Sequence, residues 1–167
     1  MGLMTPRGLA FPILALAGLA PALAAAQPGA LAAVEVRAVV GHGKRAADAR
    51  PELPASLAPL AAVLAQTPYA RFEDRGGPSA RGAAGEVLSL EGLPAGYSVR
   101  CAWSEAPGGG LELTLTLLRK RPKRPPERVV RVRARVQEGG AYLLKCPGAR
   151  EEGGDLLLVV RARRLDG

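Results

Sequence analysis

The stretch Leu111-Glu-Leu-Thr-Leu-Thr-Leu117 alternates apolar and polar side chains without a break. Successive side chains of a β-strand point to opposite faces, so this pattern places the leucines on one face and the polar residues on the other. The stretch Val130-Arg-Val-Arg-Ala-Arg-Val136 repeats the alternation with arginine at each polar position. Together they predict two half-buried strands of an antiparallel sheet, joined through a basic turn at 119–128.

Segments on both sides of this pair are also typical of strands. Residues 97–104 alternate, with Tyr97, Val99, Cys101 and Trp103 on one face. The apolar run in 155–163 predicts a central strand that is buried on both faces. Further strands are expected at 34–40, 69–73, 86–90 and 141–146. Clusters of glycine, proline and polar residues predict loops at 41–51, 74–85 and 147–154.

One helix is expected, at about residues 55–66. Its apolar stripe has the spacing of one helix face and consists of Leu57, Leu60, Ala61 and Leu64. Ser56 is the expected N-cap, Pro59 falls in the first turn, and Thr67-Pro68 ends the helix. The predicted fold class is therefore α+β, mostly β, with an antiparallel sheet or small sandwich of about six to eight strands and one covering helix.

The first 26 residues have the pattern of a cleaved secretory signal peptide. Arg7 precedes an uncharged apolar core at 8–20, and small residues precede the expected cleavage site after Ala26, with Ala24 as the second choice. A transmembrane anchor is the alternative, but this core is shorter than the ~20 residues that a spanning helix needs. Sec-type export would leave a short tether at 27–33 and a single globular domain at 34–167, periplasmic or extracellular, with no transmembrane span in the mature chain.

The chain has two cysteines, Cys101 and Cys146. In an oxidising compartment such a pair usually forms a disulfide, which is the pairing we expect. A redox-active pair is disfavoured because the Cys-x-x-Cys spacing is missing. Two free buried thiols are the remaining alternative.

The basic segment is the most unusual feature of the sequence, in a chain whose formal net charge is +8. Its charge continues along one face of the following strand, which makes it the expected contact for an anionic partner. The residues concerned are Arg119, Lys120, Arg121, Lys123, Arg124, Arg128, Arg131, Arg133 and Arg135. The alternatives are a solvated hairpin tip and contact with lipid phosphate, an anionic polymer, DNA outside the cell or an acidic protein patch. Nucleic acid is disfavoured because no aromatic side chain lies within 119–135 to stack on bases.

Residue patterns typical of catalysis are not apparent. There is no Gly-x-Ser-x-Gly elbow, no serine–lysine pair is marked by its context, and the single histidine, His42, lies in a predicted loop. Glu151, Glu152 and Asp155 lack the ligand spacing of a calcium loop. We expect no bound metal and no cofactor. The sequence favours an exported, non-enzymatic binding or assembly module of the cell envelope. The alternative is a small secreted enzyme inhibitor, acting through 147–154, or a hydrolase.

Overall fold

The structure, a computed structural model that describes residues 30–165, confirms a mostly β fold with two antiparallel sheets and little helix. The described chain contains nine strands: β1 (Leu31–Lys44), β2 (Tyr69–Asp74), β3 (Ser79–Ala83), β4 (Val87–Leu90), β5 (Tyr97–Glu105), β6 (Leu111–Arg121), β7 (Arg124–Val136), β8 (Ala141–Glu151) and β9 (Gly154–Leu165). Its helical parts are α1 (Ala61–Leu64) and two 3-10 turns, η1 (Ala55–Leu60) and η2 (Pro94–Gly96). No helix within 30–165 is long and apolar enough to cross a membrane. The predicted signal peptide, 1–26, lies outside the described residues.

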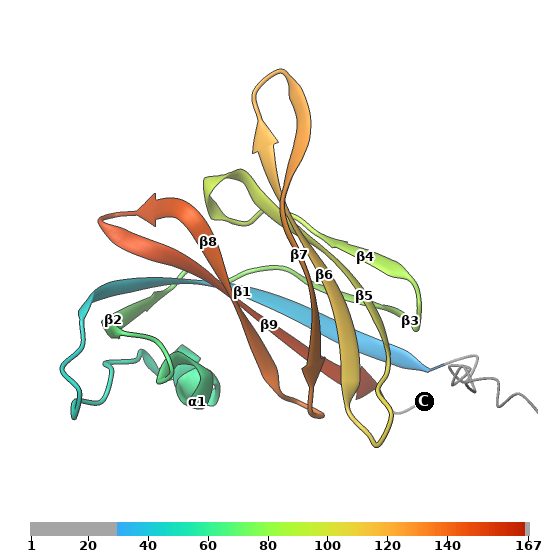
Figure 1. The fold of residues 1–167 in the computed structure, drawn as a ribbon, viewed down its shortest axis with the longest axis horizontal. Coiled ribbons are helices and arrows are strands. Elements are labelled where there is room, and N and C mark those ends of the chain that lie inside the picture. The colour runs from blue at the N-terminus through green and yellow to red at the C-terminus, as the bar shows by residue number, and fades with distance from the viewer. Residues whose placement is uncertain (1–29, 166–167) are drawn as a thin grey trace, which may run out of the picture.

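The two sheets form two layers, and we refer to them as sheet A and sheet B (Figure 1). Sheet A has the order β2-β1-β9-β8, and β3 pairs with β1 on the same side as β2. Sheet B has the order β4-β5-β6-β7, so β7 is its edge strand. All strand pairs named here are antiparallel.

The main core lies between the sheets and contains the leucines of the 111–117 stretch. All four are fully buried, as their alternation predicts. They pack in one cluster with inward side chains of β1 and β9, including Val34, Val36, Leu158 and Val160. Burial of this apolar surface is the main stabilising contribution to the sandwich.

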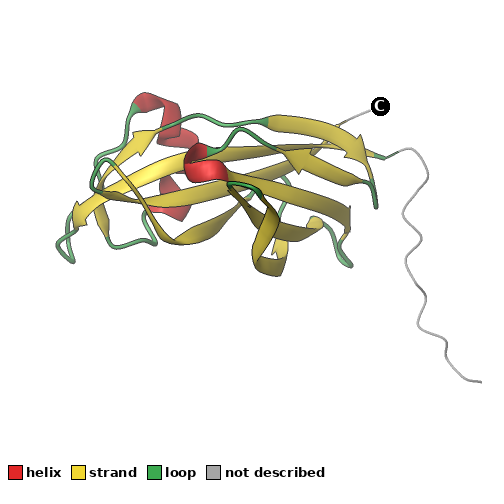
Figure 2. Cartoon of the chain, turned by 90° about the horizontal axis from the view of Figure 1, so that it is seen from above, coloured by secondary structure: helices red, strands yellow, loops and turns green. Residues whose placement is uncertain are grey.

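Strand β9 is central in sheet A, and Leu156 to Val160 are buried on both of its faces, as predicted. A second core on its outer face contains Leu157 and Val159 together with Leu57, Leu60 and Leu64 of the helical segment. Figure 2 shows that strands make up most of the body and that the helical turns lie at its surface. The covering helix is therefore confirmed.

The predicted cap of this helix is wrong. Pro54 occupies the N-cap position, no side chain caps the first turn, and that turn is a 3-10 helix. Pro59 lies inside the turn and has no N–H to donate, which favours the tighter 3-10 geometry over a regular α-helix.

Strand β3 lies within the segment 74–85, which the sequence indicated as a loop. It pairs with Leu31–Glu35 of β1, so 31–33 belong to a strand and not to the predicted tether. A side chain of sheet B also holds the backbone of β3 in place. The buried indole of Trp103 donates a hydrogen bond to the Gly82 carbonyl at 3.0 Å. A side chain at Gly77 would meet the Val36 carbonyl at 1.9 Å, so only glycine fits this approach. The sequence predicted about six to eight strands, and β3 is the additional strand that brings the number to nine.

Two other expected loops are hairpins with two-residue turns. Strands β6 and β7 turn at Pro122 and Lys123, and strands β8 and β9 turn at Glu152 and Gly153. Positive φ values of 47° and 83° at the latter pair are typical of a type I′ turn. Within the segment 147–154, which we expected to be an exposed inhibitory loop, Arg150 and Glu151 pair with Asp155 and Gly154 to form the end of this hairpin.

The predicted disulfide is not present, because Cys101 and Cys146 are both free, buried thiols. They lie on different sheets, and burial raises the pKa of each to about 12. The pKa of the Tyr97 phenol is raised first by burial and then by the charge of Cys146. Both thiols lie in the core between the two sheets.

Candidate functional site

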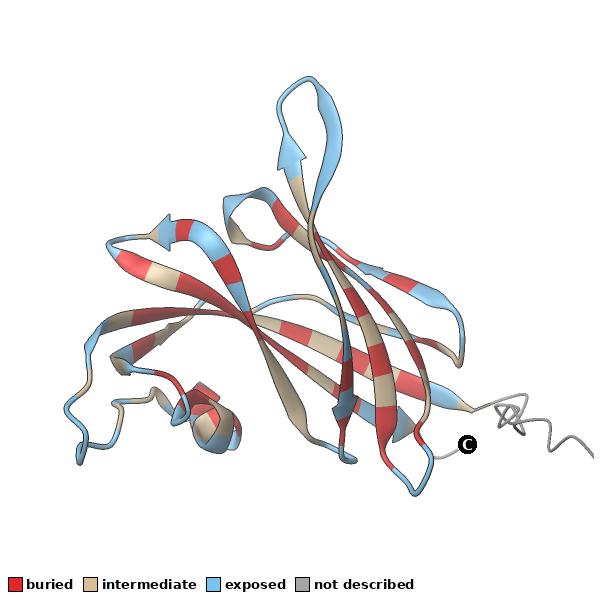
Figure 3. Cartoon of the chain, viewed as in Figure 1, coloured by how far each residue is buried: buried red, intermediate tan, exposed pale blue. Residues whose placement is uncertain are grey.

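The predicted basic segment forms a projecting arm, which we define as residues 119–128. It is the end of the β6–β7 hairpin and extends beyond the rest of sheet B (Figure 1). Figure 3 shows that its surface is exposed. Pro122 at the tip is followed by Lys123 with a φ of 57°, an order typical of a type II turn. The proline restricts the backbone at the tip and so limits the arm's freedom.

A β-bulge in β7 determines which side of the hairpin its arginines occupy. Leu117 is paired with Val130, but Leu118 is paired with Arg128, which leaves Val129 as an extra residue. Directly paired residues point to the same face, and a regular strand alternates its faces. Arg128 and Arg131 are three positions apart and would lie on opposite faces of a regular strand. The bulge returns Arg128 to the face of Arg131.

The outer face of sheet B consequently carries a line of cations, which we call the basic row. Arg131 and Arg133 are paired with Thr116 and Thr114 of β6, and Thr116 is also paired with Arg100 of β5. The Cα atoms of Arg100 and Arg131 are separated by two strand spacings, about 10 Å. The members of the basic row, all exposed, are Arg100, Lys120, Arg128, Arg131 and Arg133.

Three of the nine predicted contact residues have partners within the protein. The Arg119 guanidinium lies over the Tyr97 ring at 5.6 Å, and Arg121 Nε donates to the Glu127 carboxylate at 2.8 Å. Arg135 donates to the Pro107 and Gly109 carbonyls, which fixes the β5–β6 turn. These side chains serve the fold of the arm and the turn.

The other six predicted residues make no ion pair or side-chain hydrogen bond with any residue in 30–165. They are Lys120, Lys123, Arg124, Arg128, Arg131 and Arg133. Glu112 is the only carboxylate at the outward positions of β6 and β7, and it is paired with Arg135 at the end far from the arm. The charge of this face therefore rises toward the arm.

Arg100 is the member of the basic row that sequence reasoning missed. The alternation of 97–104 places it on the outer face of its strand, but its neighbours depend on the pairing with β6. The register of two strands cannot be read from the alternation of one of them.

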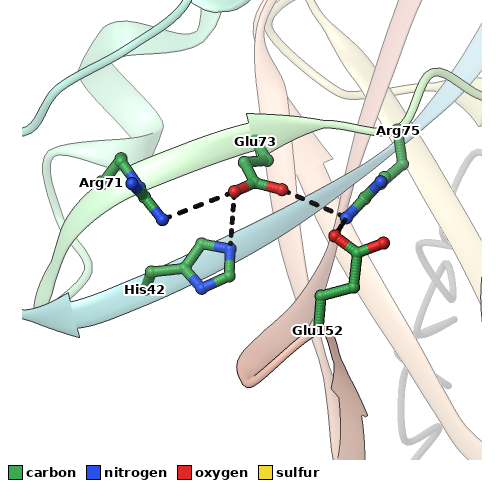
Figure 4. Close-up of polar contacts among 5 residues, drawn as sticks. All are labelled: His42, Arg71, Glu73, Arg75 and Glu152. Carbon is green, nitrogen blue, oxygen red and sulfur yellow. Dashed lines mark hydrogen bonds and ion pairs between the residues drawn. The ribbon is translucent and has the colours of Figure 1, made fainter.

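A second polar cluster surrounds Glu73 on sheet A (Figure 4). One Glu73 oxygen lies 3.3 Å from His42 Nε2 and 3.5 Å from Arg71, and the other lies 3.1 Å from Arg75. Arg75 also donates to Glu152 in the β8–β9 turn, and this hydrogen bond raises the pKa of Arg75. His42 is in β1, not in the predicted loop, because the paired part of β1 reaches Lys44. The cluster joins the ends of three strands.

The arrangement around Glu73 indicates a structural role. Both carboxylate oxygens are engaged by side chains of the neighbouring strand ends, His42, Arg71 and Arg75. Nearby, Tyr69 donates to Asp155 at 2.6 Å, and burial followed by this hydrogen bond raises the pKa of Tyr69 to about 12. No group of three or more His, Cys, Asp or Glu residues in the described part of the chain is placed to hold a metal ion.

The basic row is therefore the arrangement with the clearest capacity to bind a ligand, through charge and through guanidinium hydrogen bonds to oxyanions. Comparisons with protein-family models, curated proteins and solved structures found no match to this chain.

Proposed function

We propose that this chain is an exported, non-enzymatic binding module of the cell envelope, which binds an extended anionic polymer along the basic row. The observation that supports this most is the bulge at Val129, which places Arg128 on the same face as Arg131 and Arg133. Same-face residues of a strand are about 7 Å apart, so these cations form a regular series. A polymer with repeated anionic groups can contact several of them at once.

The shape of the surface favours a polymer over the other anionic partners. The free cations follow the length of β7 and cross to Arg100 on a sheet face, instead of surrounding only the tip of the arm. A lipid surface would be contacted best by the tip, where Lys123 and Arg124 lie. Thr114 and Thr116 between the arginines add hydroxyl groups that can bond to a polar chain.

Export is the part of the proposal that rests on residues 1–26, with Arg7, an apolar core and small residues before position 27. Intact mass of the protein recovered outside the cytoplasm tests it. A mature chain that begins at Gln27 supports export, and a membrane-bound chain that retains Met1 contradicts it.

Arg100 offers a sharp test of the binding surface, because only the structure connects it with β7. We expect Arg100→Thr to weaken binding to size-defined heparin oligosaccharides, which are linear polyanions, in isothermal titration calorimetry at low salt. Arg50→Thr removes the same charge from an exposed loop residue and serves as the matched control, with binding unchanged. Equal effects of the two substitutions would contradict a defined surface. Tighter binding to phosphatidylglycerol vesicles than to heparin would show a lipid surface as the partner.

A further inference from the structure

The outer face of sheet A is apolar at one end and basic at the other. Along β9, the outward side chains of Leu157 and Val159 lie in the core beneath the helical segment. The next outward residues, Arg161 and Arg163, lie outside that core and line a cavity of about 400 Å³. This basic cavity is separate from the basic row, which lies on sheet B.

The floor and sides of the basic cavity follow from strand register. Ala33 of β1 is paired with Arg81 of β3 on one side and with Arg163 of β9 on the other. The small Ala33 side chain leaves room between two arginines whose Cα atoms are about 10 Å apart. Arg161, two residues along β9, adds a third guanidinium to the lining.

These three arginines have no carboxylate partner among residues 30–165. Glu35 also lines the cavity and is paired in register with Arg161, but its ion pair is with Arg37, at 3.7 Å. The cavity therefore has a surplus of positive charge and several free N–H donors. Guanidinium groups in this state match the oxygens of a phosphate or sulfate group.

A groove of about 530 Å³, lined by both apolar and polar groups, adjoins the basic cavity. It lies between the helical segment and the start of β8, and its lining includes Leu60, Val63 and Leu143. Gly139 of the β7–β8 turn lines both spaces, and Ala141 of the groove is paired with Arg161 of the cavity. Both volumes lie in the range of small-molecule sites. A single ligand could therefore reach from one space to the other.

We propose that this surface binds an anionic amphiphile, with a phosphate or sulfate head among Arg81, Arg161 and Arg163 and an alkyl chain in the adjoining groove. The basic cavity supplies charge for the head, and the groove supplies apolar surface for the chain. Neither part alone selects such a ligand: the cavity would accept any small oxyanion, and the groove any small apolar group.

Alkyl phosphates of increasing length test the proposal. Butyl, hexyl and octyl phosphate, titrated into the mature protein below their micelle concentrations, should bind with rising affinity. Each fully buried methylene contributes about fourfold, so the three ligands should differ strongly. Octyl sulfate should bind like octyl phosphate if any oxyanion is accepted, and less tightly if the doubly charged phosphate is required. Octyl glucoside, with the same chain and no charge, should bind much more weakly than either.

Paired substitutions locate the two halves of the site. Arg81→Ser with Arg163→Ser should weaken octyl phosphate binding at least tenfold, whereas Arg71→Ser with Arg150→Ser, a matched loss of charge elsewhere on sheet A, should have no effect. Val63→Gln should reduce the gain per methylene and leave butyl phosphate binding unchanged. Thermal unfolding of each variant shows whether it is folded.

Two results would overturn the proposal. The first is an affinity that does not depend on chain length, which would mean that the groove takes no part. The second is equal weakening by the two arginine pairs, which would mean that the cavity is not the site. Variants of the basic row, Arg131→Thr with Arg133→Thr, should bind octyl phosphate as the wild type does, so the proposal stands or falls independently of polymer binding.

Discussion

Removing Arg131 and Arg133 from the basic row should lower both the affinity for a linear polyanion and the dependence of that affinity on salt. Both side chains are exposed and make no ion pair with any residue in 30–165. Thr is the chosen replacement because it favours strands and already occupies the paired positions 114 and 116. Folding should therefore be nearly unaffected, since exposed charges contribute little to stability.

The magnitude follows from the number of cations that contact the polymer. Each neutralised phosphate contributes about −0.7 to −0.9 to the slope of log K against log salt concentration for nucleic acids, and we take the same range for other linear polyanions. The five residues of the basic row then give a slope of about −4, and the three left in the variant give about −2.4. A fourfold rise in salt should weaken wild-type binding about 250-fold and binding of the variant about 30-fold.

Calorimetric titration with heparin oligosaccharides between 50 and 200 mM salt measures both slopes. The matched control is Arg71→Thr with Arg150→Thr, which removes the same charge from exposed positions of sheet A. Its slope should stay near the wild-type value. A control slope reduced as far as that of the β7 variant would rule out a defined binding surface, because net charge alone would then explain the binding.

Three predictions concern the fold. Leu115→Ala, at a fully buried position between β5 and β7, should lower the free energy of unfolding by about 3–5 kcal/mol in chemical denaturation. Burial raises the pKa of Cys101 and Cys146 to about 12, whereas unfolded thiols ionise near 9, so the free energy of unfolding should fall as pH rises above about 9. Thermal unfolding of a variant with both Cys101→Ala and Cys146→Ala should depend less on pH in this range. Gly77→Ala should lower the melting temperature, because its Cβ would meet the Val36 carbonyl of β1; an unchanged melting temperature would show that the segment before β3 does not lie this close to β1.

The alternation of apolar and polar residues was sufficient to predict most strands and the class of the fold. Strands β6 and β7 have one face in the core, so their pattern directly records burial. Strand β3 could not be predicted in this way, because its sequence Ser-Ala-Arg-Gly-Ala has no large apolar side chain. It is held by backbone pairing to β1. In the 3-10 turn at 55–60 the predicted apolar stripe is buried, but the predicted cap is missing. The packing of Leu57 and Leu60 in the second core stabilises this turn without a capping side chain.

The proposed binding surface could be predicted only in part. Charge density identified the arm and the arginines of β7, because composition is visible without a structure. The role of Arg135 in a turn, the approach of Arg100 through Thr116 and the effect of the bulge on Arg128 all depend on strand pairing. Strand pairing depends on contacts between residues far apart in the sequence, and these contacts cannot be read from the sequence alone.

If a polyanion lies along the outer face of sheet B, NMR of the arginine Nε–Hε groups should show which side chains it contacts. During titration of the protein with a heparin oligosaccharide, we expect saturable shifts at Arg100, Arg128, Arg131 and Arg133. Arg135, which is bonded to the β5–β6 turn, should shift little. Shifts spread equally over Arg71 and Arg150 of sheet A, or absent from Arg100, would contradict binding along this face of sheet B.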